Sequence, residues 1–247
     1  MLRGGSGALV AGYKTALREP QAGEYSVTRL AGRQVAETSS LVATFPRPAE
    51  PLVVYEFDAC PFCKKVREMA SYLDLDILFK PAPQGGPTFR PEGAALRKAQ
   101  DGKAGFPFLV DPNTGVQMGE SDDIIAYLAK TYGNGEVPLM LRLGVLTALT
   151  AGLCSLPRAG RGARYRPARM PEQPLVLWGY ESSPFVRLVK ERLCELELPH
   201  VMRNCARGSP KRQEVFDAYG KFQVPFLQVR VGWAAWDGSR GVGAGAC

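Results

Sequence analysis

The sequence predicts an α/β protein that contains two tandem copies of one small domain, the second of them truncated. Two segments, Leu52–Leu75 and Leu175–Leu198, match along their length when Pro61 is aligned with Pro184, which lies 123 positions later. In each segment a short apolar run precedes a stretch of helical period, and a Pro-Phe-Leu sequence follows farther along. A strand, a helix and a second strand in this order imply parallel pairing of the strands.

Composition fits this class. The 247 residues are 45 % hydrophobic and 22 % charged, which excludes a disordered or collagen-like chain. The longest apolar stretch, Val137–Leu156, is interrupted by Arg142, so we expect no transmembrane segment. The net charge of +7 comes largely from an acid-free stretch, Pro157–Pro171. We expect this stretch to be a solvated tether between the domains, and we expect no nucleic-acid partner. Its arginines are Arg158, Arg161, Arg164, Arg166 and Arg169.

The first domain is expected over residues 51–134, in the order β-α-β then α-β-β-α. Its first helix has Pro61 in the first turn, where the missing N–H costs nothing, and a buried face with helical spacing (Val66, Met69, Ala70, Leu73). A dense turn signal, Asp111–Gly115, separates the last two strands. The expected strands are Leu52–Phe57, Ile77–Lys80, Pro107–Val110 and Val116–Gly119. After the helix that begins at Pro61, further helices are expected at Glu92–Gln100 and Ser121–Tyr132.

The second domain is expected over residues 174–229. Its elements are expected at Leu175–Trp178, Val186–Leu196, His200–Arg203 and Pro225–Val229. The final strand and helix of the first domain have no counterpart, and residues 230–247 form an irregular tail without helical or strand period. Because the truncation leaves an open sheet edge, we expect this domain to be the less stable one.

Two segments lie outside the copies. Residues 135–173 are expected to form a connecting helix and the Arg-rich linker. Residues 1–50 resemble neither copy, show little periodicity and form an N-terminal extension that could serve as a targeting segment. Glu19, Glu24 and Glu37 argue against that role, because transit peptides contain few acids.

Among six cysteines, only Cys60 and Cys63 have a spacing of chemical meaning. The pattern is therefore no secreted disulfide framework and favours a reducing compartment inside a cell. Cys60 is expected at a helix N-terminus, where unpaired N–H groups favour the thiolate, and Lys64 and Lys65 add positive potential. A Cys60 thiolate could attack a disulfide, and Cys63 could resolve the mixed disulfide that results.

Other interpretations of these residues stay open. The two cysteines could be ordinary buried residues. A zinc site needs two further ligands, for which no second cysteine pair or His/Cys cluster exists, so no metal is expected. His200, the only histidine, is expected to be structural. The remaining cysteines are expected to be small core or surface residues (Cys154, Cys194, Cys205) and a free thiol in the tail (Cys247).

Three motifs of the first copy resemble a known family. Cys60–Cys63 after an apolar strand, Phe106–Leu109, and Glu120–Asp123 at the start of a helix resemble the thioredoxin-like domain of glutaredoxins and of glutathione S-transferase N-terminal domains. The fold class implied is thus two tandem thioredoxin-like (glutaredoxin-type) domains, the second truncated. The tandem arrangement with its Arg-rich linker resembles a family of plant and algal chloroplast proteins, which implies a chloroplast location.

The resemblance also implies roles for single residues. Pro107 corresponds to a cis-proline, the backbone of Phe106 would pair with the peptide part of glutathione, and Glu120 and Ser121 would hold its γ-glutamyl end. Helix capping by the same Ser-Asp-Asp sequence is an equal alternative. In the second copy, Ser183 stands in the place of Cys60 and valine in that of Cys63. This excludes dithiol chemistry there. The resemblance extends to transferases that use a serine hydroxyl to hold the glutathione thiolate, which Ser183 could also do, but the truncated end lacks the Glu-Ser pair and favours a structural or vestigial site.

The function predicted is that of a glutathione-linked thiol-disulfide oxidoreductase. Cys60 and Cys63 would be catalytic, glutathione would be the co-substrate, and disulfide-bonded or glutathionylated proteins would be the partners. One alternative is glutathione transfer, or isomerisation as in prostaglandin E synthase type 2. Another is a non-catalytic glutathione-binding or scaffold protein. An iron-sulfur cluster held by Cys60 and glutathione across a dimer rests on family analogy alone.

Overall fold

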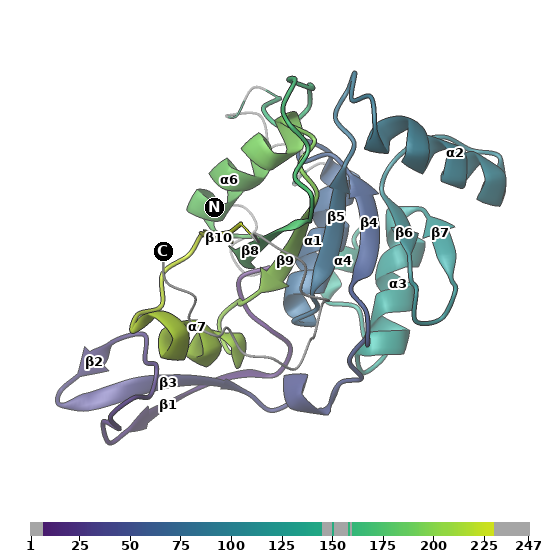
Figure 1. Cartoon of the computed structure of the whole chain (residues 1–247). Helices are drawn as coiled ribbons and strands as arrows, with labels where there is room; N and C mark the ends of the chain where they lie inside the picture. The colour runs from purple at the N-terminus through teal and green to yellow at the C-terminus, as the bar shows by residue number, and fades with distance from the viewer. Residues whose placement is uncertain (1–6, 145–149, 151–157, 159, 230–247) are drawn as a thin grey trace.

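The strands of both copies lie in one sheet. The computed structural model describes residues 7–144, 150, 158 and 160–229. Seven strands form a mixed sheet in the order β10-β8-β9-β5-β4-β6-β7, and a separate three-stranded sheet has the order β1-β3-β2 (Figure 1). Helices cover the larger sheet, and the α/β class predicted from the sequence is confirmed.

The first copy contains the elements expected of it. β4 and β5 are parallel, and β6 and β7 continue the sheet in antiparallel pairs. One boundary prediction was wrong: α2 starts at Phe89 rather than at Glu92. The elements are β4 (Leu52–Glu56), α1 (Pro61–Tyr72), β5 (Ile77–Pro81), α2 (Phe89–Asp101), β6 (Phe108–Val110), β7 (Gln117–Gly119) and α3 (Ser121–Tyr132).

The second copy repeats the order of the first up to its third strand. The sequence analysis missed its second helix, α7, because among the apolar side chains of that helix Val215 alone is buried and a helical period is hard to see. The tail expected at residues 230–247 lies outside the described residues. The elements are β8 (Leu175–Gly179), α6 (Pro184–Glu195), β9 (His200–Asn204), α7 (Lys211–Tyr219) and β10 (Phe226–Gln228).

β5 and β9 join the copies in an antiparallel pair. Leu78 lies directly opposite Val201, which is its own counterpart 123 positions later. A pseudo-two-fold axis therefore runs through this pair, perpendicular to the sheet. On one side of the second copy, β9 pairs with β5 of the first copy. On its other side, β10 is the last strand of the sheet within the described residues. The expected open edge is thus confined to one side of the second copy.

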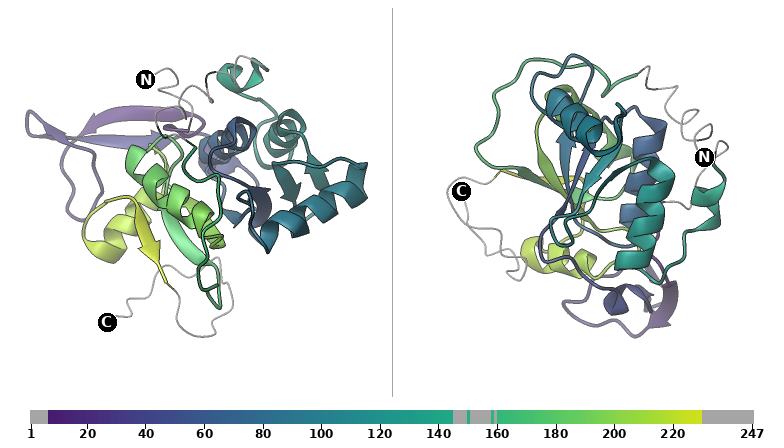
Figure 2. Two further views of the ribbon diagram at one scale, coloured as in Figure 1. Left: turned by 90° about the horizontal axis from the view of Figure 1, so that it is seen from above. Right: turned by 90° about the vertical axis from the view of Figure 1, so that its right-hand side faces the viewer.

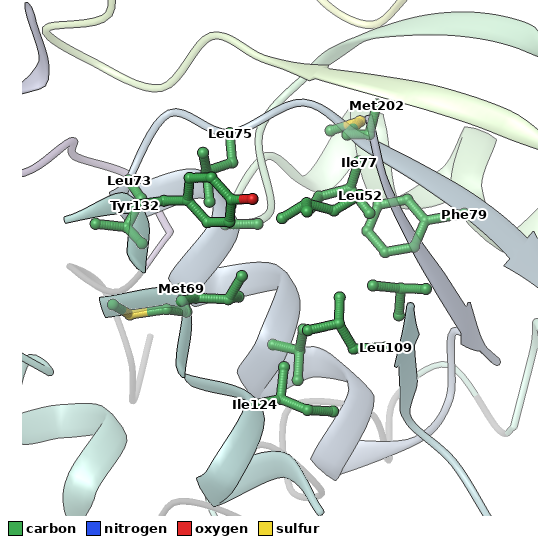
Figure 3. Packing of buried hydrophobic residues seen from close by; sticks show 14 of the residues in the cluster. Leu52, Met69, Leu73, Leu75, Ile77, Phe79, Leu109, Ile124, Tyr132 and Met202 are labelled. Atoms are coloured by element: carbon green, nitrogen blue, oxygen red, sulfur yellow. The ribbon is translucent and has the colours of Figure 1, made fainter. Parts of the chain in front are cut away.

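The main core lies on one face of this sheet and runs across both copies. Alternate strand residues point to opposite faces, so Leu52 and Val54 of β4 meet α1 and α3, while Val53 and Tyr55 face α2. Figure 3 shows the main core near the junction, where Met202 of β9 packs beside Ile77 and Phe79 of β5. On the opposite face, α2 and α7 cover one smaller cluster each (Figure 2).

The N-terminal segment is structured, which its weak periodicity did not predict. β1 (Tyr13–Arg18), β2 (Arg29–Leu30) and β3 (Arg33–Ser39) are joined by backbone pairing, with most β1 side chains exposed. This sheet, drawn in purple in Figures 1 and 2, lies beside α7. The Glu37 side chain, which is buried, pairs there with Arg207 and Arg212 of the second copy.

The Arg-rich linker is packed, so the prediction of a solvated tether is wrong for its first half. Arg158 forms a two-pronged pair with the buried Glu191 of α6, at 2.7 and 3.0 Å. The Gly162 N–H donates to Glu195, and the Tyr165 N–H donates to the Gln84 carbonyl after β5. A short helix, α4 (Leu139–Arg142), precedes the linker. Within the described part of the chain, no helix has both the length and the apolar character needed to cross a membrane.

Candidate functional site

Cys60 lies at the N-terminus of α1, where β4 ends. It is the N-cap residue, and its Sγ accepts the backbone N–H of Cys63 at 3.3 Å. The Phe106 carbonyl lies 3.9 Å from the same sulfur. Cys60 is 4 % exposed and Cys63 is fully buried, and both are free thiols. The structure therefore brings Cys60, Cys63 and Phe106 together.

The two thiols differ in their surroundings. The pKa of Cys60 is lowered, first because the Cys63 side chain hydrogen-bonds to it, and further by backbone N–H groups and the charge of Arg67. Burial raises the pKa of Cys63 well above the usual thiol value, and the neighbouring Cys60 and Glu56 add to the rise. Of the two thiols, Cys60 is thus the one whose ionised form is favoured, and Cys63 is the one whose ionisation is opposed.

The lysines after Cys63 do not supply the positive potential expected of them. Lys64 contacts Glu181 at 3.2 Å and Glu68 at 3.7 Å. Lys65 is 2 % exposed and pairs with Asp122 at the start of α3. The buried Arg67, one helical turn beyond Cys63, is a cation that favours ionisation of Cys60.

The loop before β6 forms the second wall of the site. The Phe106–Pro107 bond is cis, as the resemblance implied. The Phe106 ring meets Phe57 edge to face, and the Arg90 guanidinium lies 5.5 Å from its centroid. α2 approaches this ring closely at Gly93, where a Cβ would lie 3.0 Å from the ring of Phe106. The position of α2 therefore bears directly on the loop that faces Cys60.

Glu120 and Ser121 lie at the junction of β7 and α3. Glu120 has a left-handed backbone (φ +65°), and its carboxylate accepts from Arg97 at 2.7 Å and Lys103 at 3.3 Å. Ser121 is the first residue of α3 and is buried. Glu120 is the N-cap residue of α3 and its side chain makes no cap hydrogen bond, whereas Asp122 and Asp123 lie in the first turn, where their charges compensate the helix dipole. The Glu120 carboxylate is instead neutralised by two cations, a feature the sequence did not predict.

Ser183 repeats the local geometry of Cys60 without its chemistry. It is the N-cap of α6, and its Oγ accepts the Val186 N–H at 3.4 Å. The Val224–Pro225 bond is also cis. Because β8 runs antiparallel to β4 in the shared sheet, Ser183 lies at the opposite end of the sheet from Cys60. A hydroxyl paired with a valine cannot form a disulfide, as expected.

His200 is a structural residue, as predicted. It lies on β9 against the ring of Phe79, 5.7 Å between centroids, and its Nδ1–H donates to the Leu198 carbonyl at 3.1 Å. Burial lowers its pKa to about 4. Its Nε2 is buried without a hydrogen-bond partner among the described residues. The neutral imidazole therefore serves packing between the copies.

A cluster of buried charges beside the dithiol escaped the sequence analysis. Arg67 on α1 and Lys190 on α6 point into the junction between the copies, where they meet carboxylates from both. The available signal was the presence of Arg67 and Lys190 at corresponding positions, 123 apart, in the two helices. The acids of this cluster are Glu56, Asp58 and Glu181, all at most 7 % exposed. Within the described residues, no three or more His, Cys, Asp or Glu side chains are arranged so that they could hold a metal ion.

Comparison with known proteins identifies the domain that holds the dithiol. Residues 54–136 match the family described as glutathione S-transferase, N-terminal domain. This stretch has the thioredoxin-like fold of that domain. No curated protein matches the chain.

Two solved structures are similar in part, both of the Bombyx mori glutathione transferase BmGSTD1. The first is 22 % identical with a TM-score of 0.31. The second, in complex with GTT, is 21 % identical with a TM-score of 0.32. Each match covers 46 % of this chain and 50 % of the transferase, so the chain spans half the length of these structures.

Proposed function

We propose that the protein is a glutathione-linked thiol-disulfide oxidoreductase whose nucleophile is Cys60. The observation that carries this proposal is the asymmetry of the dithiol. Cys60 sits at a helix N-terminus with a lowered pKa, and the buried Cys63 donates to it and retains its own proton. A thiolate beside a protonated partner at a helix start is the arrangement that thiol-disulfide exchange needs.

The proposed substrate is a glutathionylated protein. The Cys60 thiolate attacks the glutathione sulfur, the original S–S bond breaks, and the protein leaves as a thiolate that takes a proton from water. A second glutathione thiolate then attacks the mixed disulfide, which yields oxidised glutathione and restores Cys60. Alternatively Cys63 loses its proton and attacks Cys60, which expels reduced glutathione and leaves a Cys60–Cys63 disulfide for two further glutathiones to reduce.

Glutathione is proposed to lie along the Phe106–Pro107 loop toward α3. The Phe106 backbone would pair with its peptide part, and the first-turn N–H groups of α3 at Ser121 would meet the γ-glutamyl carboxylate. The Glu120 carboxylate already accepts hydrogen bonds from Arg97 and Lys103. In the proposed complex it would also accept one from the γ-glutamyl ammonium group. The chloroplast location implied by the resemblance stays a prediction.

The test is reduction of a glutathionylated peptide with glutathione as the reductant. We expect Cys60→Ser to abolish turnover, and Cys63→Ser to keep it through the direct glutathione route. Cys205→Ser is the matched control, because Cys205 is also a buried thiol, but lies in the second copy beside Gly179. Full turnover by Cys60→Ser would refute the proposal.

A second candidate function is glutathione transfer, which the match of residues 54–136 to a transferase domain favours. Conjugation of glutathione to a chlorinated nitrobenzene separates the two. Rapid conjugation that survives Cys60→Ser would favour the transferase over the oxidoreductase.

A further inference from the structure

The buried charges at the junction of the copies form a closed ring. Arg67 contacts Asp58 at 3.7 Å and Glu181 at 3.0 Å. Lys190 contacts Asp58 at 3.4 Å and also pairs with Glu181. Each base thus meets both acids, and all four residues are at most 7 % exposed. Glu56 adds a fifth charge through its pair with Arg67.

The ring follows the pseudo-symmetry of the chain. Asp58 and Glu181 are counterparts 123 positions apart, and so are Arg67 and Lys190. Each copy therefore contributes one acid and one base, and neither copy can close the ring alone. Removing one member would leave a buried charge uncompensated, which is costly in a dry interior.

The ring adjoins the starts of α1 and α6 alike, but of these two only the start of α1 carries thiols. Arg67 follows Cys63 by one helical turn on α1, and Asp58 precedes Cys60 by two residues, with its backbone N–H donated to the Cys194 sulfur of α6 at 3.3 Å. Charges buried this close to a thiolate act on it with little screening.

We propose that Glu181 and Lys190 of the second copy are positioning residues for the Cys60–Cys63 site of the first. They hold Arg67 and Asp58 in place beneath the dithiol and so set how readily Cys60 ionises. This inference rests on the proposed function, which it deepens. The second copy, which has no dithiol of its own, supplies half of the electrostatic support for the dithiol of the first.

The charges that surround the dithiol agree with this role. Arg67 favours the ionised form of both thiols, whereas Glu56 opposes ionisation of Cys63. Burial alone would lower the pKa of Arg67, but Glu181, Glu56 and Asp58 together raise it, so the guanidinium stays charged. The other charged groups near α1 are internally paired: Lys64 with Glu68 and Glu181, and Lys65 with Asp122.

The test compares two substitutions of opposite sign. The pKa of Cys60 is measured in the full chain from the pH dependence of its alkylation by iodoacetamide, followed by mass spectrometry on the peptide that contains Cys60, in a Cys63→Ser background so that this peptide carries a single thiol. Glu181→Gln removes an anion and should lower that pKa, whereas Lys190→Gln removes a cation and should raise it. At the Coulomb energy of a partly screened buried charge, each substitution should change the pKa of Cys60 by roughly 0.5 to 1.

The control is Glu37→Gln, which also neutralises a buried, doubly paired carboxylate, but at the N-terminal sheet. It should leave the pKa of Cys60 unchanged. Lys190→Arg restores the charge and should restore the parent value. If Glu181→Gln does not fold, the test relies on the other two variants: Lys190→Gln should raise the pKa of Cys60, and Lys190→Arg should leave it at the parent value.

General loosening of the fold would shift the pKa of Cys60 in the same direction in both glutamine variants. That outcome, or an unchanged pKa in both variants, overturns the inference. The parent protein reports on the proposed function separately. An ordinary thiol pKa of about 8.5 in the parent refutes a primed nucleophile, whereas a low parent value with unmoved variants refutes the ring alone.

Discussion

Glu197 of the second copy is expected to hold the start of α2 in the first. Its carboxylate accepts the Phe89 N–H at 2.8 Å and the Thr88 N–H at 3.1 Å. Glu197 is 1 % exposed and follows α6 with a left-handed backbone, φ +53°. Thr88, the local N-cap residue, makes no side-chain cap of its own. The α2 N-terminus therefore depends on an acid from the other copy.

Glu197→Ala is predicted to destabilise the protein by about 2 to 4 kcal/mol. Loss of an N-cap costs roughly 1 to 2 kcal/mol, and each buried donor left without its charged acceptor costs roughly 1 to 3 kcal/mol. Two such donors are involved, and relaxation of the helix end recovers part of the sum. Glu197→Gln keeps one acceptor oxygen and should cost about 1 kcal/mol. Neither change relieves the left-handed backbone, so strain cancels in the comparison.

Urea denaturation of the two variants gives the free energies of unfolding. Gly86→Ala tests the same contact from the other side, since its Cβ would lie 2.7 Å from the Glu197 Oε1 and must displace the carboxylate. In the Glu197→Ala background, Gly86→Ala should then cost little. Equal losses for the alanine and glutamine variants, or fully additive losses for the double variant, would refute the reasoning.

Three further predictions concern other buried contacts. Gly119→Ala should destabilise the protein by roughly 1 to 3 kcal/mol in urea, because its Cβ would lie 1.5 Å from the Arg97 guanidinium; in an Arg97→Ala background most of that loss should vanish. Since the pKa of His200 falls from 6.5 to about 4 on folding, the unfolded chain binds the extra proton. Stability should be lost as pH falls through that window, by about 3 kcal/mol, and pH-dependent denaturation of His200→Leu should lack this slope. Arg158→Ala should lower the urea midpoint and speed proteolysis of the linker, because Glu191 stays buried without its two-pronged partner; unchanged cleavage would contradict a packed linker.

The sequence predicted what local patterns determine. The strand and helix order of the first copy follows from apolar runs and turn signals, and the Cys60 N-cap follows from the cysteine before Pro61. The start of α2 was misplaced because its cap, Glu197, lies 108 residues beyond Phe89. Lys64 and Lys65 were expected to act on Cys60 as unpaired charges, because their partners, Glu181 and Asp122, lie far along the chain. Contacts between distant segments leave no periodic trace in one sequence.

The misjudged contacts between the two copies share one cause, which is the antiparallel β5–β9 pair. By joining the copies edge to edge, it brings α1 beside α6 and each helix start near the other copy. Glu197 then reaches α2, and Glu181 and Lys190 reach the segment that carries Cys60. The second copy has no dithiol, yet its charged residues lie in contact with the segment that carries one. The proposed positioning role therefore predicts that substitution of Glu181 or Lys190 registers at Cys60, even though Ser183 itself lies at the far end of the sheet.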